Sequence, residues 1–495
     1  MWTDDLHKLI YAHVVLIGVP TIFYYCLRLG GYSLVNVHFA IATFFLVSSV
    51  MMLLEASSAL LQPVGWLTKG HSRGWRRLHR SATRSLGRLK LEAGTPPSTV
   101  PGSTLPRCSV LIAAYLPNEQ GIILDTLRHI LYAVKHSAAG LEVILTYNTP
   151  EDLPIEDDLK QLADRHPELQ LLRVEGSLSK AENINAALEL VTGEITCILD
   201  ADHQPAPDCF ERAWYWLQQG YDVVQGRNII RNHRSNLLTQ TIAVEFESVY
   251  GVSHTAKSVL TDSTIFGGSN GYWHSSVLKQ IRFNPGMLTE DIDASLRTLL
   301  SGYRILHDRS IITTELAPDN FTAFWFQRKR WSHGWLEVGI RYQPRVWKSK
   351  HFTPWQKLYW TYLLYYYGIF AVATLQILPL ILSLWLYEGG LPPSHNSYLW
   401  FCTVIAFFSG FYQTLITGRI AAARYPILYF IQHIVLLFAY AVLKNTIAVV
   451  AIYDYLHGHN KWVVTPRADR GQHSVPEGIA SQLLASTATS SNSAL

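Results

Sequence analysis

Two carboxylates follow a short apolar run in the middle of the chain, in the order Asp200-Ala201-Asp202. The run before them, Ile195 to Leu199, has no helical period, which is typical of a strand buried on both faces. Side chains alternate on an extended chain, so we expect both carboxylates on one side of the strand's carboxyl end, where open α/β sheets bind ligands. Carboxylates, water and a diphosphate suit Mg²⁺ or Mn²⁺. An isolated pair of acids is also common in an ordinary strand-end turn.

Four further motifs contain residues that could act with this pair. Lys180 opens a predicted helix after Ser179, and a lysine at a helix N-terminus suits a diphosphate. The glycine-rich loop at 267–271 allows close approach of its backbone, although such loops are usually plain turns. Asp291 lies in the sequence Thr289-Glu290-Asp291, which alone is more often a helix start. The sequence Gln-Arg-Lys-Arg-Trp at 327–331 is alone more often a membrane-interface anchor.

The elements that must position these residues show strand–helix alternation from residue 108 to about 320. We expect a parallel sheet with right-handed crossovers, a nucleotide-binding α/β architecture. The predicted strands are 108–115, 141–147, 169–174, 194–200 and 221–226, and the predicted helices lie near 118–137, 155–166, 180–192 and 207–219.

Long apolar segments flank this region on both sides. The chain is 49% hydrophobic and only 16% charged, and its 15 Trp and 26 Tyr suit a protein with much membrane-interface surface. The segments long enough to cross a bilayer are 9–27, 39–61, 358–387 and 399–417. Glu55 is the acid within the second of these and is expected to face protein or the interface. The pattern leaves open whether 427–453 spans the membrane or lies along it.

A basic loop follows the first two apolar segments. Residues 69–90 contain eight Lys and Arg and no acid, which places this loop and the following domain in the cytosol. A nucleic-acid patch would have the same charge, but directly after a membrane span anionic lipid head groups are the better partner.

These observations divide the chain into six parts. We expect a transmembrane hairpin, a basic cytosolic linker, the α/β domain, an interfacial helix, further membrane helices, and a tail that is disordered in its last part. Their ranges are 1–62, 63–107, 108–320, 321–350, 351–455 and 456–495. The predicted protein is therefore an integral, multi-pass protein of the plasma or inner membrane with a cytosolic α/β domain.

In this order, the Asp-x-Asp pair, the Thr-Glu-Asp triplet and the Gln-x-x-Arg-Trp motif resemble family 2 glycosyltransferases of the processive, membrane-embedded kind. Cellulose synthase, hyaluronan synthase, chitin synthase and plant mannan synthases belong to that family. The resemblance covers roughly residues 108–340. It implies a nucleotide-binding GT-A type catalytic domain. Trp462, Thr465 and Arg467 in the sequence WVVTPR also resemble the gating-loop motif of cellulose synthase.

The resemblance implies a role for each matching residue. Asp291 would be the general base, and Asp200 and Asp202 would bind the metal and the diphosphate of a UDP-sugar, with Asp202 the more direct ligand. Gln327, Arg330 and Trp331 would hold the diphosphate and the acceptor sugar. Tyr115, Glu119 and Lys180 would contribute to the nucleotide-sugar site.

Asn148 departs from the family pattern, because the second strand normally ends in one or two Asp that contact the base or ribose. Its amide can still form hydrogen bonds but carries no charge, which puts the usual uracil contact in doubt. The histidines His203, His333, His457 and His459 lack metal-ligand spacing and are interpreted as polar surface or loop residues.

The sequence therefore predicts an inverting, metal-dependent, processive transferase that makes a β-linked polysaccharide, of the glucan type first, and passes it across the membrane. The alternative is a non-processive enzyme that places one sugar on a lipid. A transport or scaffold protein without activity is a third class, which the intact acids argue against. The expected partners are a UDP-sugar, a growing polysaccharide or lipid acceptor and membrane lipids, but no nucleic acid. The need for an accessory export subunit stays open.

Overall fold

The computed structural model of the chain describes residues 2–61, 104–389 and 397–458. The predicted basic loop, the WVVTPR motif with Trp462, Thr465 and Arg467, and the tail lie outside the described residues.

One half of the central sheet is parallel, as the alternation predicts. Its strands run in the order β3-β2-β1-β4, with all three pairings parallel. The strands are β1 (Cys108–Tyr115), β2 (Leu141–Asn148), β3 (Leu169–Arg173) and β4 (Ile195–Asp200). β1 and β4 are buried along almost their whole length, which explains why their sequences are apolar without alternation.

The other half of the sheet is mixed, which the sequence does not predict. Within the described residues the sheet has eight strands, and β7 pairs antiparallel with both β4 and β6. The strands of this half are β5 (Gln204–Pro205), β6 (Val223–Ile230), β7 (Gly271–His274) and β8 (Ile305–Glu315), of which β6 overlaps the strand predicted at 221–226. A Cβ on Gly271 would lie 2.2 Å from the Phe266 ring, so only glycine allows this close approach.

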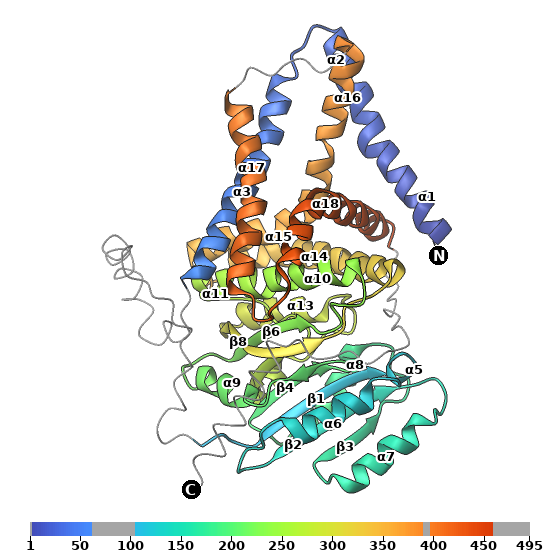
Figure 1. Ribbon diagram of the computed structural model, residues 1–495, viewed down its shortest axis with the longest axis vertical. Helices are drawn as coiled ribbons and strands as arrows, with labels where there is room; N and C mark the ends of the chain where they lie inside the picture. The colour runs from blue at the N-terminus through green and yellow to red at the C-terminus, as the bar shows by residue number, and fades with distance from the viewer. Residues whose placement is uncertain (1, 62–103, 390–396, 459–495) are drawn as a thin grey trace, which may run out of the picture.

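Amphipathic helices cover the faces of this sheet (Figure 1). In α6 the side chains of Ile123, Leu127 and Ile130 are buried at helical spacing. Each such side chain contributes about 1.5–3 kcal/mol when it is fully buried. The helices are α5 (Leu116–Glu119), α6 (Ile123–Ala133), α7 (Ile155–Arg165), α8 (Lys180–Ala187), α9 (Cys209–Leu217), α12 (Ser275–Ile281) and α13 (Glu290–Leu300). α11 (Thr255–Thr261) packs mainly against α3 and lies at the level of the transverse helices (Figure 1).

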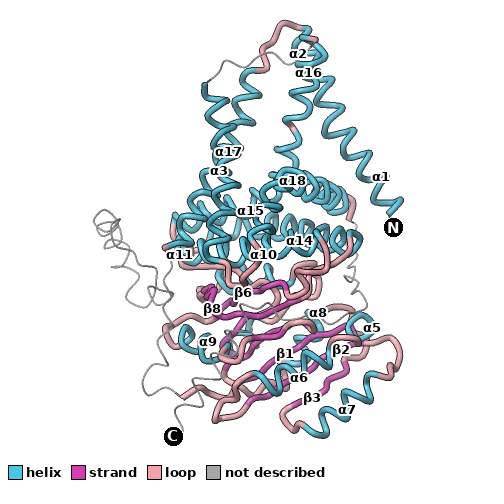
Figure 2. Tube along the Cα trace, viewed as in Figure 1, coloured by secondary structure: helices cyan, strands magenta, loops and turns pink. Residues whose placement is uncertain are grey.

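A layer of transverse helices separates the sheet from the upright apolar helices (Figures 1 and 2). Its members are α10 (Leu237–Ser248), the π-helix η3 (Val249–His254), α14 (Phe321–Lys348), α15 (Pro354–Leu375) and α18 (Ile427–Leu456). Asn320 caps α14 by accepting a hydrogen bond from the backbone of Ala323 at 2.9 Å. The predicted interfacial helix at 321–350 is thus a continuous helix in this layer.

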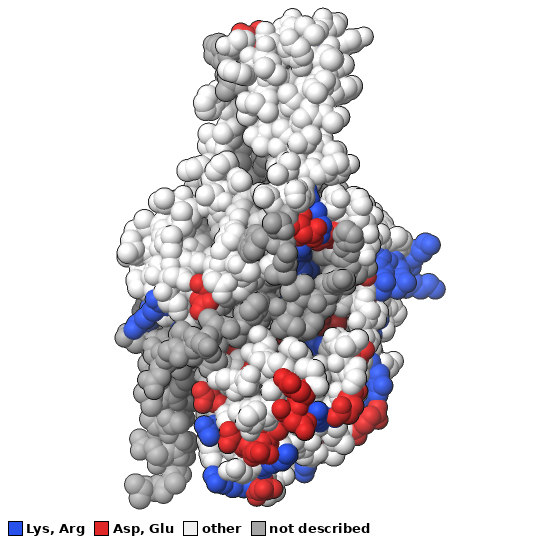
Figure 3. Space-filling model, turned by 90° about the vertical axis from the view of Figure 1, so that its right-hand side faces the viewer, with Lys and Arg blue, Asp and Glu red and all other residues white. Residues whose placement is uncertain are grey.

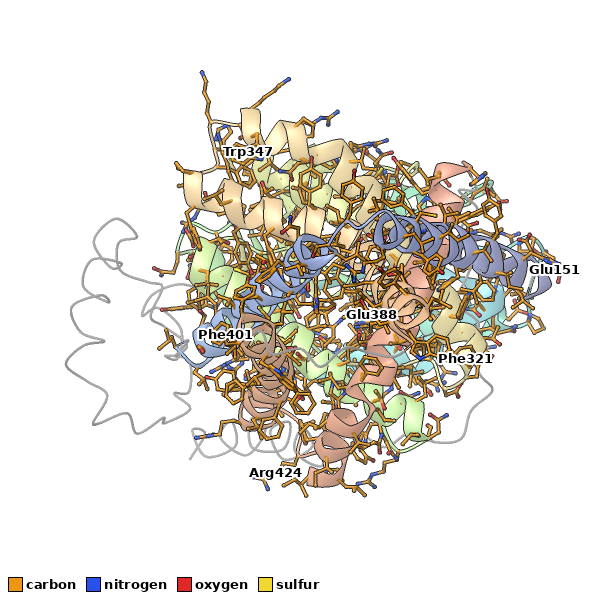
Figure 4. All side chains as sticks on the ribbon, turned by 90° about the horizontal axis from the view of Figure 1, so that it is seen from above. Glu151, Phe321, Trp347, Glu388, Phe401 and Arg424 are labelled. Carbon is orange, nitrogen blue, oxygen red and sulfur yellow. The ribbon has the colours of Figure 1, made fainter. Side chains whose placement is uncertain are left out.

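The upright helices form the upper part of the molecule. They are α1 (Trp2–His13), η1 (Val14–Gly18), α2 (Val19–Leu29), α3 (Val35–Leu60), α16 (Ile377–Glu388) and α17 (Ser397–Ile420). Charged side chains gather over the sheet domain, whereas this part shows hardly any (Figure 3). Near its tip Arg28 pairs with Glu388 at 2.6 Å, and Glu388 lies near the middle of the view from above (Figure 4).

Five described helical stretches are long and apolar enough to cross a membrane, at 4–29, 35–60, 368–388, 397–420 and 427–456. The single span predicted at 358–387 is instead divided into α15 and α16 at Gln376. Pro379 has no N–H to donate to the preceding turn, which explains a break at this point. The stretch that is long and apolar enough to cross a membrane begins only at residue 368.

α18 also belongs to the transverse layer. Gln432 contacts the α10 residues Leu237 and Thr241 at 3.3 Å, and further along the helix Lys444 reaches Glu245 at 2.8 Å. Near its end Asp454 pairs with Lys329 of α14 at 3.1 Å. α18 therefore follows α10 and α14 although its composition would allow it to span.

Two buried charges join the sheet to the upright helices. Arg227 of β6 pairs with Glu247 of α10 and donates to the carbonyl of Ile420 at 3.0 Å. Glu247 in turn accepts from the backbone N–H of Ala423 at 3.2 Å. Both side chains are almost completely buried, so the loop after α17 is held by a desolvated ion pair.

Candidate active site

A cavity of about 970 Å³ extends from the carboxyl ends of the strands to the transverse helices and α3. The predicted site residues within the described chain all border it, although they come from distant parts of the sequence. They are Tyr115, Glu119, Asn148, Lys180, Asp200, Asp202, Asp291, Gln327, Arg330 and Trp331.

Asp200 ends β4 and borders the cavity with about a third of its side chain exposed (35%). Its carboxylate pairs with Lys180, which Ser179 places at the start of α8 by capping the helix. The Lys180 ammonium also donates to the carbonyl of Gly268 at 2.7 Å. Lys180 thus brings a positive charge to the first carboxylate of the pair.

Asp202 has a different environment, because the chain turns directly after β4. The expectation that alternation places both carboxylates on one side therefore does not apply. Asp202 is buried, and its Oδ2 accepts from the backbone N–H of Leu316 at 2.8 Å. Its Oδ1 lies 3.2 Å from Nδ1 of His203.

His203 is buried rather than on the surface, which corrects the sequence-based interpretation. Its Nε2 lies 2.9 Å from Glu315 at the end of β8, so the imidazole lies between two carboxylates. Burial alone favours the neutral ring, but Glu315 and Asp202 raise the pKa of His203 to about 10. The protonated ring neutralises part of the acidic charge. His333 is also buried.

Asp291 lies in the first turn of α13, at the wall of the cavity. A Cβ on Gly268 would lie 2.9 Å from Asp291 Oδ2, and Gly268 has a φ of +85°, so the loop can approach this carboxylate only with glycine. Burial and the neighbouring charge of Glu290 raise the pKa of Asp291 to about 7, against the opposing effect of Lys180 and Arg330. A carboxyl group with this pKa can accept a proton near neutral pH.

The motif at 327–331 faces the cavity from α14. The buried atoms Gln327 Oε1 and Arg330 Nε have no hydrogen-bond partner among the described residues. Buried polar atoms are rarely left in this way, and a bound ligand is one reason for it. The Trp331 ring lies beneath the Arg328 guanidinium, whose carbon is 4.4 Å from the ring centroid.

The opposite end of the cavity is formed by the ends of β1 and β2. Asn148 donates to the carbonyl of Ser177 at 2.9 Å and accepts from Asn183 at 2.8 Å. Its amide is therefore engaged on both sides within the protein. Asn148 is therefore a neutral residue where the family pattern has an acid, and its bond to Ser177 fixes the loop before α8.

Asp200 is the carboxylate of the pair with surface available for a hard divalent cation, because both oxygens of Asp202 are already engaged by Leu316 and His203. Asp200 has exposed carboxylate surface toward the cavity, and Asp202 lies beside it. Among the described residues no cluster of three or more His, Cys, Asp or Glu forms a metal site. An ion here would take its remaining ligands from a diphosphate and water, which Mg²⁺ accepts.

Sequence reasoning missed several polar residues of the cavity. Glu315, Tyr250 and Glu245 border it, yet none belongs to a motif with recognisable spacing. His203 follows Asp202 directly, and this adjacency was a signal that could have placed it in the site. Glu55 accepts from Tyr359 at 2.5 Å and from Ser253 at 2.9 Å, so it faces protein as predicted.

Residues 106–334 match the family described as "Glycosyltransferase like family 2". Residues 106–334 therefore form a domain of the family 2 glycosyltransferase type. It is 24% identical over 328 residues to a probable glycosyltransferase, YdaM, of Bacillus subtilis (strain 168), covering 63% of this chain and 74% of that protein. It is 25% identical over 322 residues to a poly-beta-1,6-N-acetyl-D-glucosamine synthase of Staphylococcus epidermidis, covering 62% and 71%.

Two further similarities concern mannose-transferring proteins. A probable glucomannan 4-beta-mannosyltransferase of Arabidopsis thaliana is 26% identical over 172 residues, covering 34% of this chain and 31% of that protein. The mannosyltransferase PcManGT from Pyrobaculum calidifontis, solved with GDP-Man and Mn²⁺, has a TM-score of 0.52 at 20% identity, covering 84% of this chain and 98% of that one. The latter similarity shows the GT-A type fold of this glycosyltransferase, which apolar helices flank on both sides.

Proposed function

We propose that this glycosyltransferase extends a β-linked polysaccharide from a UDP-sugar, with inversion at the anomeric carbon and with Mg²⁺ or Mn²⁺. The observation that carries the proposal is the cavity, which joins Asp200 and Asp291 to side chains of α3, α15 and α18 without a break. An enzyme that added one sugar to a soluble acceptor would need no cavity that extends to the membrane helices. The growing end of a polymer could occupy the cavity toward the membrane helices.

Aromatic side chains line the membrane half of this cavity. Tyr362 and Tyr366 stack with ring centroids 4.8 Å apart, and Phe370 follows at 4.5 Å from Tyr366. They recur every four residues along one side of α15, and all border the cavity. This row of aromatic side chains, with Glu55 and Gln413 beside it, is proposed to contact the apolar faces and hydroxyl edges of sugar rings.

The leaving diphosphate needs positive charge and hydrogen-bond donors where its own charge develops. Arg330, Gln327 and Lys180 border the cavity and are proposed to supply them. A divalent ion held by Asp200 and Asp202 would neutralise further charge. Tyr115, Glu119 and Asn148 are proposed to form the nucleotide end of the site.

Asp291 is proposed to remove the proton from the attacking acceptor hydroxyl. Its pKa of about 7 leaves it half ionised at neutral pH, as a general base requires. No second carboxylate is assigned as a nucleophile, so a single displacement is expected. An α-linked donor would then give a β-linked product. Trp331 is proposed as the platform beneath the acceptor sugar.

The relatives favour a polymer product but do not select the sugar. Their names specify a β-1,6-linked N-acetylglucosamine polymer and a β-mannosyl glucomannan. The glucan type stays a prediction of the sequence. A second candidate is transfer of one sugar to a lipid, which is favoured by apolar side chains such as Met52, Leu363 and Leu437 in the membrane half of the cavity.

The five apolar helical stretches support a membrane location for this enzyme, and its topology is part of the proposal. We assign the catalytic domain at 108–320 to the cytosol and the helix at 321–350 and α18 to the membrane interface. The contacts of α18 with α10 and α14 support this assignment. The partners would be membrane lipids, the donor and the growing polysaccharide.

The decisive experiment offers membrane vesicles UDP-glucose, UDP-N-acetylglucosamine, UDP-glucuronate and GDP-mannose separately, with Mg²⁺ or Mn²⁺. Radiolabelled product is sized and digested with linkage-specific glycosidases. We expect a long β-linked polymer from one UDP-sugar and a loss of product with EDTA.

The same assay is then run on Asp291→Asn, which keeps the shape of the side chain and removes its basicity. We expect it to lower transfer by about 10²–10⁴-fold while UDP binding persists. A polymer made at the wild-type rate by this variant would contradict the base assignment. A glycolipid as the only product would favour the second candidate, and incorporation from GDP-mannose alone would contradict the UDP-sugar assignment.

A further inference from the structure

One carboxylate in the transverse layer binds groups from two different helices. Glu245 of α10 accepts from Arg328 of α14 at 2.6 Å, from Tyr440 of α18 at 2.7 Å and from Lys444 of α18 at 2.8 Å. We call these four residues the Glu245 cluster. The Glu245 side chain is 9% exposed, so its bonds form in a largely desolvated environment where they are strong.

Arg328 connects this cluster to the acceptor side of the cavity. Its guanidinium carbon lies 4.4 Å from the centroid of the Trp331 ring, within the range of a cation–π contact. Phe246, next to Glu245, has its ring centroid 6.4 Å from that of Trp331. The position of the Trp331 ring therefore depends on where Glu245 holds the guanidinium.

α18 contributes two of the residues that bind Glu245 in this cluster. Lys444 and Tyr440 both bind Glu245, and the Phe324 ring of α14 lies 5.8 Å from the Tyr440 ring between centroids. Lys444, Tyr440 and Ala448 also border the cavity. A displacement of α18 would thus remove hydrogen bonds and positive charge from around Glu245, and so change how Glu245 binds Arg328. Although burial opposes ionisation, Arg328 and Lys444 lower the pKa of Glu245 to about 2, so the carboxylate stays charged.

We propose that Glu245 and Arg328 are positioning residues that fix Trp331 against the acceptor and make its position depend on α18. This inference rests on the proposed function in taking Trp331 as the acceptor platform. Neither residue is assigned a contact with the donor. The cluster therefore links the seating of α18 on the catalytic domain to acceptor binding, and leaves donor binding unaffected.

The kinetic test uses Lys444→Met, because the Lys444 side chain is 42% exposed and its loss leaves no new buried charge on α18. In purified full-length enzyme in nanodiscs, we expect the acceptor KM to rise about tenfold, with the donor KM within twofold of wild type. Lys444→Arg keeps the charge and should restore the acceptor KM. Gln432→Ala is the matched control, since Gln432 binds α10 but not the cluster.

The structural test needs no substrate. The protein is labelled with 5-fluorotryptophan, and the ¹⁹F resonance of Trp331 is assigned with Trp331→Phe. Lys444→Met and Arg328→Gln should shift this resonance, whereas Gln432→Ala should not. Arg328→Lys should shift it as well, because lysine keeps the ion pair but loses the planar stack.

The two tests separate the inference from the proposed function. An unmoved Trp331 resonance in Lys444→Met and Arg328→Gln would overturn the positioning role. A moved resonance with an unchanged acceptor KM would overturn the link to the acceptor. If the wild-type enzyme transfers no sugar at all, the proposed function fails, while the resonance still decides whether the cluster positions Trp331.

Discussion

The pH dependence of transfer offers a direct test of Asp291, through its neighbour Glu290. Burial is the largest reason why the pKa of Asp291 is raised to about 7, and the charge of Glu290 is the second. Glu290→Gln removes that charge and keeps the size of the side chain. A nearby unit charge shifts a carboxyl pKa by about one unit or more, so the variant should have a pKa near ~6 at Asp291.

The magnitude follows from the ionised fraction, since only the deprotonated carboxylate accepts a proton. With a pKa of about 7 the ionised fraction at pH 6 is roughly 9%, and with a pKa near ~6 it is roughly 50%. Glu290→Gln should therefore transfer sugar about fivefold faster than wild type at pH 6. At pH 8 both enzymes are more than about 90% ionised and should be equally fast.

The assay measures initial rates of incorporation from pH 5 to 9 at saturating donor and metal. Glu189→Gln serves as the control, because Glu189 is exposed and pairs with Arg282 away from the cavity. Its profile should match that of wild type. The reasoning would be refuted if wild type and Glu290→Gln lost half of their activity at the same acidic pH. It would also be refuted if the wild-type rate fell to half only near pH 4.

Three further changes test other parts of the molecule. Arg330→Ala should weaken UDP binding about 10–100-fold by calorimetry, because a charge-assisted bond to the diphosphate is lost; unchanged UDP inhibition would count against its phosphate role. Asp202→Asn should lower metal-dependent transfer at least ~100-fold and abolish the effect of Mn²⁺ on UDP affinity. If Mn²⁺ still changed UDP affinity in this variant, Asp202 would not be a metal ligand. Glu247→Ala should cost about 3–5 kcal/mol in thermal unfolding, since it leaves Arg227 buried without its partner, and a Tm equal to that of Glu189→Ala would contradict this.

The parallel half of the fold could be predicted from local pattern, because strands buried on both faces have a recognisable composition. β1, β2 and β4 all follow this rule. β7 could not be predicted, since Gly271–His274 is only four residues long and its direction depends on its pairing with β4 and β6. The break between α15 and α16 did have a signal in Pro379, which hydropathy alone ignores.

The candidate site was predictable where chemistry is encoded in short motifs. Asp200, Asp291 and Arg330 are such residues, and they meet in one cavity. Glu245 gave no signal, because its partners Arg328 and Lys444 are 83 and 199 residues away along the chain. Isolated acids acquire a role only when tertiary structure supplies their counter-charge.

The ion pair between Arg227 and Glu247 has a practical consequence for producing the enzyme. In the full chain the backbone around Ile420 and Ala423 supplies a further hydrogen-bond partner to each of the two side chains. A recombinant fragment ending after α14 would lack that backbone and leave two desolvated charges only partly satisfied. We expect such a truncated domain to aggregate on expression, so biochemical work on this enzyme calls for detergent or nanodiscs rather than a soluble catalytic fragment.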